Sequence, residues 1–430
     1  MREERPPAIT TPVTSLARSL LGMLRFRLEG LRPQAIVGPK ARVYKWPRAD
    51  PQDRHGFGGR QVAAVKLNRR KFLTVATAGA ATAGIAAPAL AQGAPSIDWR
   101  LVSSFPKSLD TIYGTAEVFA KVLAEMTDGR FQIRVFAPTE IVPGLSAADA
   151  VSNGSVEACH TASYYYWGKD PTFAFGTAVP FGLDYRMQNA WMYEGGGIDL
   201  MNAFYARFGI FGLPGGNTGT QMGGWYRKEI NKPEDWKGLK IRIGGLAGAV
   251  MSRIGAVPQQ IAGGDIYPAL EKGTIDAAEW VGPYDDEKLG FSKVAKYYYY
   301  PGWWEGQAML HFFFNLEKWN SLPKSYQASA KAAAALANTA MMARYDIENP
   351  QALQRLAIGG AELRPFSEAV LDACFTASNQ VFDEIAAKNA DFKKVYEAMK
   401  AVRGPDYLWF QVAEATYDTY MMIQQRKGLV

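Results

Sequence analysis

The 430-residue sequence has few of the side chains that enzymes most often use to hold metals or attack substrates, with only two cysteines and three histidines. No His-Glu-x-x-His, Cys-x-x-Cys or Gly-x-Ser-x-Gly pattern occurs in it. These absences argue against a zinc enzyme, a dithiol redox protein and an α/β-hydrolase. No acid–base pair stands beside an evident nucleophile either, so we expect the protein to bind a ligand without catalysing a reaction.

A glycine-rich segment and the two cysteines each allow two interpretations. Gly244–Gly248 follows a predicted strand and opens a predicted helix, but the Gly-x-Gly start of a dinucleotide-binding loop is missing. We expect these glycines to relieve crowding where the strand meets the helix. Cys159 and Cys374 are expected to be buried free thiols of a large core, while a disulfide between them stays open.

Net positive charge is confined to the front of the chain. Residues 1–91 contain 16 Lys+Arg and 5 Asp+Glu, whereas the other 339 residues contain 32 and 36. A general nucleic-acid-binding surface therefore lacks its main support, although the net charge of the whole sequence is +7. With 48% hydrophobic and 21% charged residues the composition is that of a globular protein, and the length favours two domains.

Residues 66–91 have the features of an export signal. Arg69-Arg70 is followed by Phe72-Leu73 and by an uncharged run that ends in Ala89-Leu90-Ala91. This order resembles a twin-arginine signal peptide with a small-residue cleavage site, which predicts a periplasmic protein. A membrane span is the alternative, but Ala, Gly and Thr dominate the run and contribute little transfer free energy.

The stretch before this signal, residues 1–65, is rich in Arg and Pro and shows no lasting periodicity. Because an export signal should lie near a start site, we expect translation to begin near Val62, Val65 or Leu67. A disordered basic extension that is removed with the signal is the alternative. N-terminal sequencing of the unprocessed precursor separates the two.

From residue 96 onward the apolar residues change repeatedly between strand and helix periodicity. The predicted strands are 97–102, 131–136, 155–162, 239–243, 257–261, 274–280 and 310–316, and the predicted helices are 110–127, 147–152, 246–254 and 265–271. This order is typical of α/β proteins with parallel sheets. The helix–Gly–strand junctions at 153–158 and 272–277 nearly repeat each other, which favours two similar lobes over chance similarity.

Beyond Pro323 the sequence predicts mainly helices, at 326–348, 368–387, 392–402 and 408–425. The last of these carries more large apolar side chains than a solvated helix should expose: Trp409, Phe410, Val412, Tyr417, Tyr420 and Met421. Packing on the chain's own core and a dimer contact would both cover them, and the sequence leaves that choice open.

A charged and aromatic cluster is the strongest candidate for a site. Arg242 ends a predicted strand at the edge where open α/β sheets place ligands, and its guanidinium can hold a carboxylate; exposure beside Lys240 is the alternative. Glu279-Trp280 ends a strand at the same edge, and Glu305 follows a run of aromatic residues. Such carboxylates need a cationic partner, either Arg242 or a metal ion with oxygen ligands. Tyr164–Trp167 should face them from the other lobe.

These segments resemble a known family, the solute-binding proteins of tripartite ATP-independent periplasmic (TRAP) transporters of the DctP type. The resemblance covers residues 96–430 and rests on Glu125–Arg130, Trp236–Arg242 and Lys272–Trp280. It implies an α/β fold of two lobes, like the type II periplasmic binding proteins, with a helical C-terminal extension. The expected lobes are 96–218 with 306–345 and 219–305 with 346–400, followed by a C-terminal helix at 401–430.

Residues 276–286 are most similar to the branch of this family that binds α-keto acids. There, the resemblance implies that Arg242 forms a salt bridge to the ligand's carboxylate and that a sodium or calcium ion joins ligand and protein. The implied cation ligands are Gln221, Glu279, Trp280 and Glu305. With the tyrosine run included, the predicted substrate-binding residues are Arg242, Gln221, Trp280, Tyr165 and Tyr166.

The predicted function is capture of a small 2-oxo monocarboxylate such as pyruvate and its delivery to membrane permease subunits, without catalysis and without nucleic acid. The alternatives are a dicarboxylate, a hydroxy acid such as lactate, or another organic acid bound without metal. An exported enzyme that carries a cofactor is the alternative from a different class. The resemblance also implies a homodimer formed through the C-terminal helix.

Overall fold

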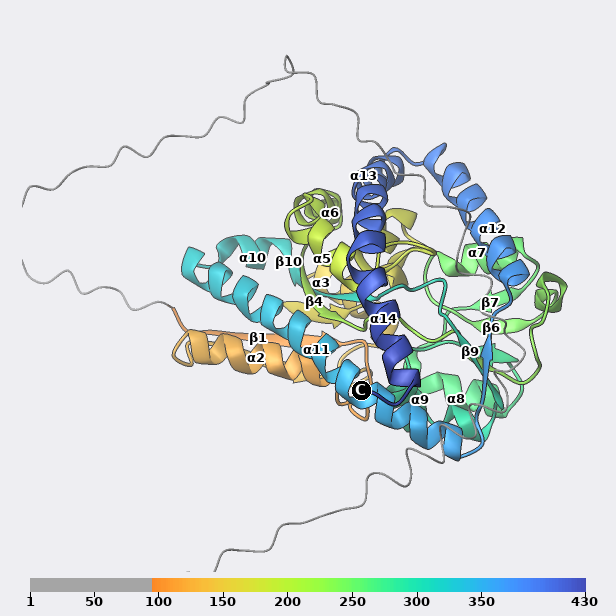
Figure 1. The fold of residues 1–430 in the computed structure, drawn as a ribbon. Coiled ribbons are helices and arrows are strands. Elements are labelled where there is room, and N and C mark those ends of the chain that lie inside the picture. The colour runs from red at the N-terminus through yellow and green to blue at the C-terminus, as the bar shows by residue number, and fades with distance from the viewer. Residues whose placement is uncertain (1–94) are drawn as a thin grey trace, which may run out of the picture. The chain divides into compact units, whose positions relative to one another are not determined.

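The computed structural model describes residues 95–430. Two β-sheets organise these residues and helices pack on both, which gives a two-lobed α/β fold (Figure 1). We name the elements that pack on the first sheet the first lobe and those that pack on the second sheet the second lobe. The predicted signal at 66–91 and the stretch 1–65 lie outside the described residues, so the twin-arginine signal stays a prediction.

The first sheet has five strands. In spatial order they are β2 (Phe131–Phe136), β1 (Ile97–Ser103), β3 (Ala158–Thr161), β10 (Met309–Asn315) and β4 (Ile210–Asn217). β1 is parallel to β2 and β3, whereas β10 is antiparallel to β3 and β4. The helices of this lobe are α2 (Gly114–Met126), α3 (Ala147–Ser152), α4 (Ala174–Thr177), α5 (Tyr185–Tyr193), α6 (Gly197–Tyr205) and α10 (Leu316–Ser321). β4 was not predicted, because its Gly-Leu-Pro-Gly-Gly stretch reads as a turn.

The second sheet has six short strands. In spatial order they are β11 (Glu362–Pro365), β9 (Tyr297–Tyr300), β5 (Gly224–Tyr226), β8 (Ala277–Ala278), β6 (Lys240–Arg242) and β7 (Val257–Gln259). The helices between them are α7 (Ala247–Arg253), α8 (Gly263–Glu271) and α9 (Pro283–Leu289). β6 runs parallel to both β7 and β8. The strand predicted at 274–280 is much shorter than expected, so Glu279 and Trp280 lie just beyond its end.

One long helix, α11 (Lys324–Ile358), joins the two lobes. Its first half packs on β4 and α2 through four small buried side chains, Ala330, Ala333, Ala334 and Ala337. Its second half packs on α9. The helix was predicted to end near Glu348 but continues past Pro350, because contact with α9 stabilises the added turns.

Three further helices follow: α12 (Glu368–Ala386), α13 (Ala390–Val412) and α14 (Glu414–Arg426). α12 packs on α7, whereas α13 crosses to α5 and α6 of the first lobe. Residues 390–400, expected with the second lobe, therefore lie on the first, where the ring of Phe392 is 4.8 Å from that of Phe175. The helix break predicted between 402 and 408 is also wrong: α13 runs through Pro405 and the chain breaks at Ala413.

The core of each lobe is filled by large aromatic side chains from strands and helices. Phe119 of α2, for example, stacks on Phe312 of β10 with ring centres 4.1 Å apart. Cys159 and Cys374 are both buried and unpaired, which confirms the expectation of free thiols. Within residues 95–430, no helix is at once long and apolar enough to cross a bilayer.

Candidate functional site

Arg242 and Glu279 meet at the ends of two neighbouring parallel strands. Arg242 is the last residue of β6 and lies opposite Ala278 of β8, so the next residue along β8, Glu279, comes beside it. The backbone N–H of Glu279 donates to the carbonyl of Arg242 at 3.2 Å. The expectation that these two side chains share one sheet edge is confirmed, and the alternative of an exposed Arg242 is wrong.

The guanidinium of Arg242 is 1% exposed and pairs directly with the carboxylate of Glu279. It also donates to the backbone carbonyls of Glu279 at 2.8 Å and of Ile261 at 3.1 Å. The indole of Trp280 covers one face of the guanidinium, with its ring centre 4.9 Å from Cζ. Nη2 of Arg242 makes no hydrogen bond, so one pair of N–H donors remains for a ligand.

Glu305 and Gln221 come to this cluster from two loops that hydrogen-bond to each other. The backbone N–H of Gln221 donates to the carbonyl of Glu305 at 3.2 Å, and that of Gly302 donates to the carbonyl of Gln221 at 3.0 Å. The next residue, Met222, donates to the carbonyl of Val281 at 3.1 Å. The predicted cation ligands Gln221, Glu279, Trp280 and Glu305 therefore lie on three adjoining segments.

Three buried oxygen atoms of this cluster have no hydrogen-bond donor: Oε1 of Gln221, Oε2 of Glu279 and Oε2 of Glu305. Unpaired buried acceptors are unfavourable, and a hard cation prefers carboxylate, amide and carbonyl oxygens as ligands. The donor set thus fits a sodium or calcium ion. In residues 95–430 no three His, Cys, Asp or Glu side chains gather closely enough to hold a metal by themselves. A cation bound here would therefore need the amide oxygen of Gln221 and a backbone carbonyl oxygen in addition to the two carboxylates.

The charges of the cluster do not balance. Burial raises the pKa of Glu305 well above its usual value, and the charge of Glu279 raises it further against the opposing effect of Arg242. Burial also raises the pKa of Glu279, although Arg242 stabilises its charged form. Two enclosed carboxylates share one guanidinium, and one more positive charge would stabilise the site.

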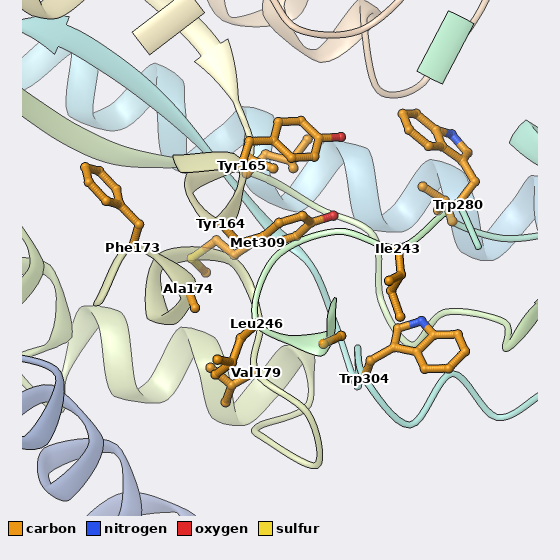
Figure 2. Packing of buried hydrophobic residues seen from close by; sticks show 14 of the residues in the cluster. Tyr164, Tyr165, Phe173, Ala174, Val179, Ile243, Leu246, Trp280, Trp304 and Met309 are labelled. Atoms are coloured by element: carbon orange, nitrogen blue, oxygen red, sulfur yellow. The ribbon is translucent and has the colours of Figure 1, made fainter. Parts of the chain in front are cut away.

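Two tyrosines of the first lobe reach across to this cluster. The hydroxyls of Tyr164 and Tyr165 both point toward the side where Trp280 and Ile243 lie (Figure 2). The ring of Tyr164 packs on the turn after β6, where a Cβ added at Gly244 would lie 2.3 Å from a ring carbon. The glycines at 244 and 245 therefore make room for a side chain of the other lobe, which the prediction of crowding within the strand–helix turn did not foresee.

Tyr166, predicted to bind substrate, is not brought to the cluster. Its hydroxyl accepts a hydrogen bond from the backbone N–H of Ala148 at 2.8 Å and lies 3.3 Å from the hydroxyl of Thr161. Residues 163–166 form a 3-10 helix, in which successive side chains point in different directions, so Tyr166 turns into its own lobe while Tyr164 and Tyr165 turn out.

A small cavity lies beside the cluster and extends its binding surface. Its enclosed volume in the described conformation is about 10 Å³, room for about one water molecule. Its polar wall is formed by Tyr164, Tyr165, Thr218, Gln221 and Trp280, and its apolar wall by Phe105, Ile112, Ala162, Val281, Ala308 and Leu310. No Lys or Arg lines it. With Arg242 against the far side of Trp280, this mostly apolar lining suits a molecule with one acidic end and a short apolar end.

Direct contacts hold the two lobes together around this cavity. Nε2 of Gln260 in the second lobe donates to the carbonyl of Tyr165 at 2.9 Å. On the outer side, the carboxylate of Asp110 accepts a hydrogen bond from Tyr284 at 3.1 Å and pairs with Lys288, both on α9. It also pairs with Arg344 of α11. The described conformation is therefore closed.

Thr218 and Gln260 were not identified from the sequence. Thr218 receives a hydrogen bond from Nε2 of Gln221 at 3.1 Å and thereby fixes which end of that amide remains free. It follows β4, the strand that was not predicted, and Gln260 belongs to a Gln-Gln pair with no distinguishing pattern. No signal in the sequence would have found either residue.

Comparison with known proteins identifies the family of this chain. Residues 102–389 match a family described as bacterial extracellular solute-binding protein, family 7, named DctP. The chain belongs to the DctP family. It is 48% identical to a monocarboxylate 2-oxoacid-binding periplasmic protein of Nostoc sp. over 365 residues, which cover 84% of this chain and 100% of that protein.

Solved structures of DctP-like proteins share the same fold. A TRAP transporter solute-binding protein of Bordetella bronchiseptica, described as a dimer with copurified calcium and picolinate, is 49% identical with a TM-score of 0.77. The match covers 78% of this chain and 99% of that one. A TRAP solute-binding protein of Pseudoalteromonas atlantica with bound sodium and pyruvate is 39% identical with a TM-score of 0.73, over 75% and 98% of the two chains.

A buried aspartate of this DctP protein should make its stability depend on pH. Asp286 accepts hydrogen bonds from Tyr298 at 2.7 Å and Trp225 at 3.0 Å, yet burial raises its pKa to about 7. The native state then holds this proton more tightly than the unfolded chain. The free energy of unfolding should fall as the pH rises from about 4 to about 7, by up to about 1.4 kcal/mol per pH unit from this group.

Urea denaturation at pH 5 and pH 7 measures this effect. Asp286→Asn should reduce the difference between the two pH values, whereas Asp199→Asn, at an exposed position on α6, should leave it as in the wild type. An equal difference in wild type and Asp286→Asn would show that Asp286 is ionised throughout.

Proposed function

We propose that this chain captures a small 2-oxo monocarboxylate, such as pyruvate, in the periplasm and delivers it to TRAP membrane subunits. The observation that carries the proposal is a free guanidinium nitrogen of Arg242 within a cluster that contains three unpaired acceptor oxygens. The carboxylate of a ligand would accept hydrogen bonds from this nitrogen, and the three oxygens would coordinate a cation. A 2-oxo acid presents the carboxylate and an adjacent oxygen that can reach both.

In this proposal Arg242 binds the ligand's carboxylate, and Gln221, Glu279, Glu305 and the Trp280 carbonyl hold a sodium or calcium ion. The ion supplies the positive charge that the two buried carboxylates lack and accepts oxygen donors from the ligand. Tyr165 and the apolar wall of the cavity enclose the ligand's alkyl end. Closure excludes water, which strengthens the charge interactions.

The relatives support this choice of ligand. The Nostoc protein is named for 2-oxo acids, and the two structures contain pyruvate with sodium and picolinate with calcium. Pyruvate and picolinate share one chemical feature, a carboxylate next to a second donor atom, so either molecule can offer two adjacent donors to one cation. That shared feature matches a site with both an arginine and a cation.

The alternatives fit this cavity less well. A dicarboxylate would need a second basic side chain besides Arg242, and the cavity beside Arg242 has no Lys or Arg in its lining. A hydroxy acid such as lactate offers a carboxylate and an adjacent oxygen as well, but that oxygen is a hydroxyl on a tetrahedral carbon in place of a ketone, so lactate is the direct competitor. We propose that the protein acts by binding alone and performs no catalysis.

Thermal unfolding of the cation-depleted protein tests the proposal. Pyruvate, 2-oxobutyrate, lactate and succinate would each be added with sodium, calcium or neither. A ligand at a hundred times its Kd should stabilise the protein by about 2.7 kcal/mol, a shift of a few degrees. We expect the shift for 2-oxo acids and only with a cation. A shift with succinate alone would overturn the ligand, and a shift without any cation would overturn the ion.

We further propose that two copies of the chain associate through α13 and α14. No residue of α14 is buried, and the large side chains Trp409, Val412, Tyr417 and Tyr420 are 58–67% exposed. Such a surface is unusual for a monomer, and the Bordetella relative is described as a dimer.

Light scattering of the purified protein checks this association. The wild type should have the mass of a dimer, and the double variant Tyr417→Glu with Tyr420→Glu should be a monomer, because two charges would enter an apolar contact. Ile358→Glu, at an equally exposed position on α11, is the matched control and should stay dimeric. A monomeric wild type would contradict the proposal.

A further inference from the structure

Two adjacent aspartates at the start of α9, Asp285 and Asp286, are fully buried and take no part in the proposed ligand or cation site. Each accepts hydrogen bonds from one indole and one phenol. Asp286 holds Trp225 and Tyr298, both on strands in the middle of the second sheet. Its partners are part of the core of that lobe.

Asp285 has different partners. Its Oδ2 accepts from the hydroxyl of Tyr345 at 2.8 Å and lies 3.4 Å from Nε1 of Trp280. Tyr345 belongs to α11, the helix that joins the lobes, and is completely buried. Oδ1 of Asp285 has no partner. One carboxylate oxygen therefore links a wall of the ligand cavity to the helix that joins the two lobes.

The orientation of the Trp280 indole matters to the site. Its face lies against the guanidinium of Arg242, and its other contacts leave little freedom: a Cβ added at Gly263 would be 2.5 Å from the indole ring. The same side chain lines the cavity. A rotation of the indole would change both the cavity and the environment of the arginine.

We propose that Asp285 is a positioning residue that holds Trp280 in its ligand-binding orientation and ties that orientation to α11 through Tyr345. The inference rests on the proposed function, because it concerns affinity for the same ligand. Both partners of Asp285 are donors, so the position requires an acceptor, and a buried carboxylate oxygen supplies two acceptor directions at one atom. Asp286 makes the same kind of side-chain contacts, but Trp225 and Tyr298 do not line the cavity and its one link to the cavity wall is a 3.4 Å contact with the backbone N–H of Val281, so it serves as the comparison.

The matched pair of variants is Tyr345→Phe and Tyr298→Phe. Each removes one buried phenol hydroxyl bonded to one of the adjacent carboxylates, so both should lower the melting temperature. Only Tyr345→Phe acts on the carboxylate that holds Trp280. Titration calorimetry with pyruvate and calcium, well below the melting temperature, should show affinity reduced by about tenfold in Tyr345→Phe and unchanged in Tyr298→Phe.

Asp285→Ala should weaken binding at least as much as Tyr345→Phe, and Asp285→Asn should restore most of it, because the amide oxygen can still accept from both donors. If Asp285→Ala does not fold, Tyr345→Phe and Asp285→Asn still decide the question. Equal affinity in wild type and Tyr345→Phe, or an equal loss in Tyr298→Phe, would overturn the proposal.

The indole ¹⁵N–¹H resonances provide a readout that does not depend on ligand. Trp280→Phe assigns the resonance of Trp280. Tyr345→Phe and Asp285→Asn should shift that resonance in the ligand-free protein, and Tyr298→Phe should not. If the wild type binds no 2-oxo acid, the proposed function fails while this measurement still tests Asp285; an unmoved Trp280 resonance in Tyr345→Phe would reject the positioning role.

Discussion

Arg242→Met is expected to abolish binding of 2-oxo acids and to lower the free energy of unfolding by about 3–5 kcal/mol, because it removes one partner of a buried ion pair. Methionine is of similar length and apolar, so it fills much of the space but leaves Glu279 and Glu305 without a countercharge. The carboxylate of the ligand would also lose its only guanidinium. Calorimetry with pyruvate and calcium measures the first effect, and urea denaturation measures the second.

Two comparisons make the Arg242 result specific. Arg253→Met removes an arginine from a partly exposed ion pair with Glu384, and should change stability by about 1 kcal/mol or less with no effect on binding. Arg242→Lys keeps the charge but loses the planar fork, and should bind more weakly than the wild type. Retained affinity in Arg242→Met would remove Arg242 from the site.

Glu305→Gln should separate cation binding from folding. The substitution preserves the shape of the side chain and removes one of the two buried carboxylates that compete for Arg242. In the absence of ligand, the variant is expected to be at least as stable as the wild type, because burial raises the pKa of Glu305 well above its usual value and the amide removes the cost of enclosing that charge. Binding of pyruvate with calcium should weaken by about tenfold or more, because one charged ligand of the cation is lost.

Thermal unfolding with and without calcium, followed by calorimetry, measures both effects of Glu305→Gln. Glu317→Gln on α10 is an exposed control and should leave both unchanged. A variant that binds pyruvate with unchanged calcium dependence would exclude Glu305 from the cation site. A variant that loses stability and affinity together would indicate a structural role for Glu305 instead.

The parts of the site that lie on regular strands could be predicted from the sequence. The two parallel strands β6 and β8 end at the same edge, and this geometry alone places Arg242 beside Glu279. The separation of Tyr165 from Tyr166 could not be predicted in the same way. A short 3-10 helix turns each successive side chain by about 120°, so the lobe-facing residue depends on where the helix begins, which the packing of the surrounding lobe sets.

The connections between the lobes were the least predictable part of the fold. Helices were predicted to end at 348 and at 402, yet α11 and α13 continue through Pro350 and Pro405. α11 buries Ala352 and Leu356 beyond its proline, whereas hydrogen bonds from Arg403 and Tyr407 to backbone carbonyls of the first lobe hold the half-exposed end of α13. Local propensity is weak compared with such tertiary contacts. The roles of Gln260 and Asp110 likewise depend on which surfaces meet when the two lobes are closed.

The turn at Gly244 has a practical consequence for the use of this protein as a sensor. Because a Cβ at position 244 would overlap the ring of Tyr164, we expect Gly244→Ala to act as a wedge between the two lobes without replacing any proposed ligand-binding residue. A fluorescent reporter of 2-oxo acids built on this protein needs a control variant that is exposed to the same solution but does not close. We expect Gly244→Ala to be such a form.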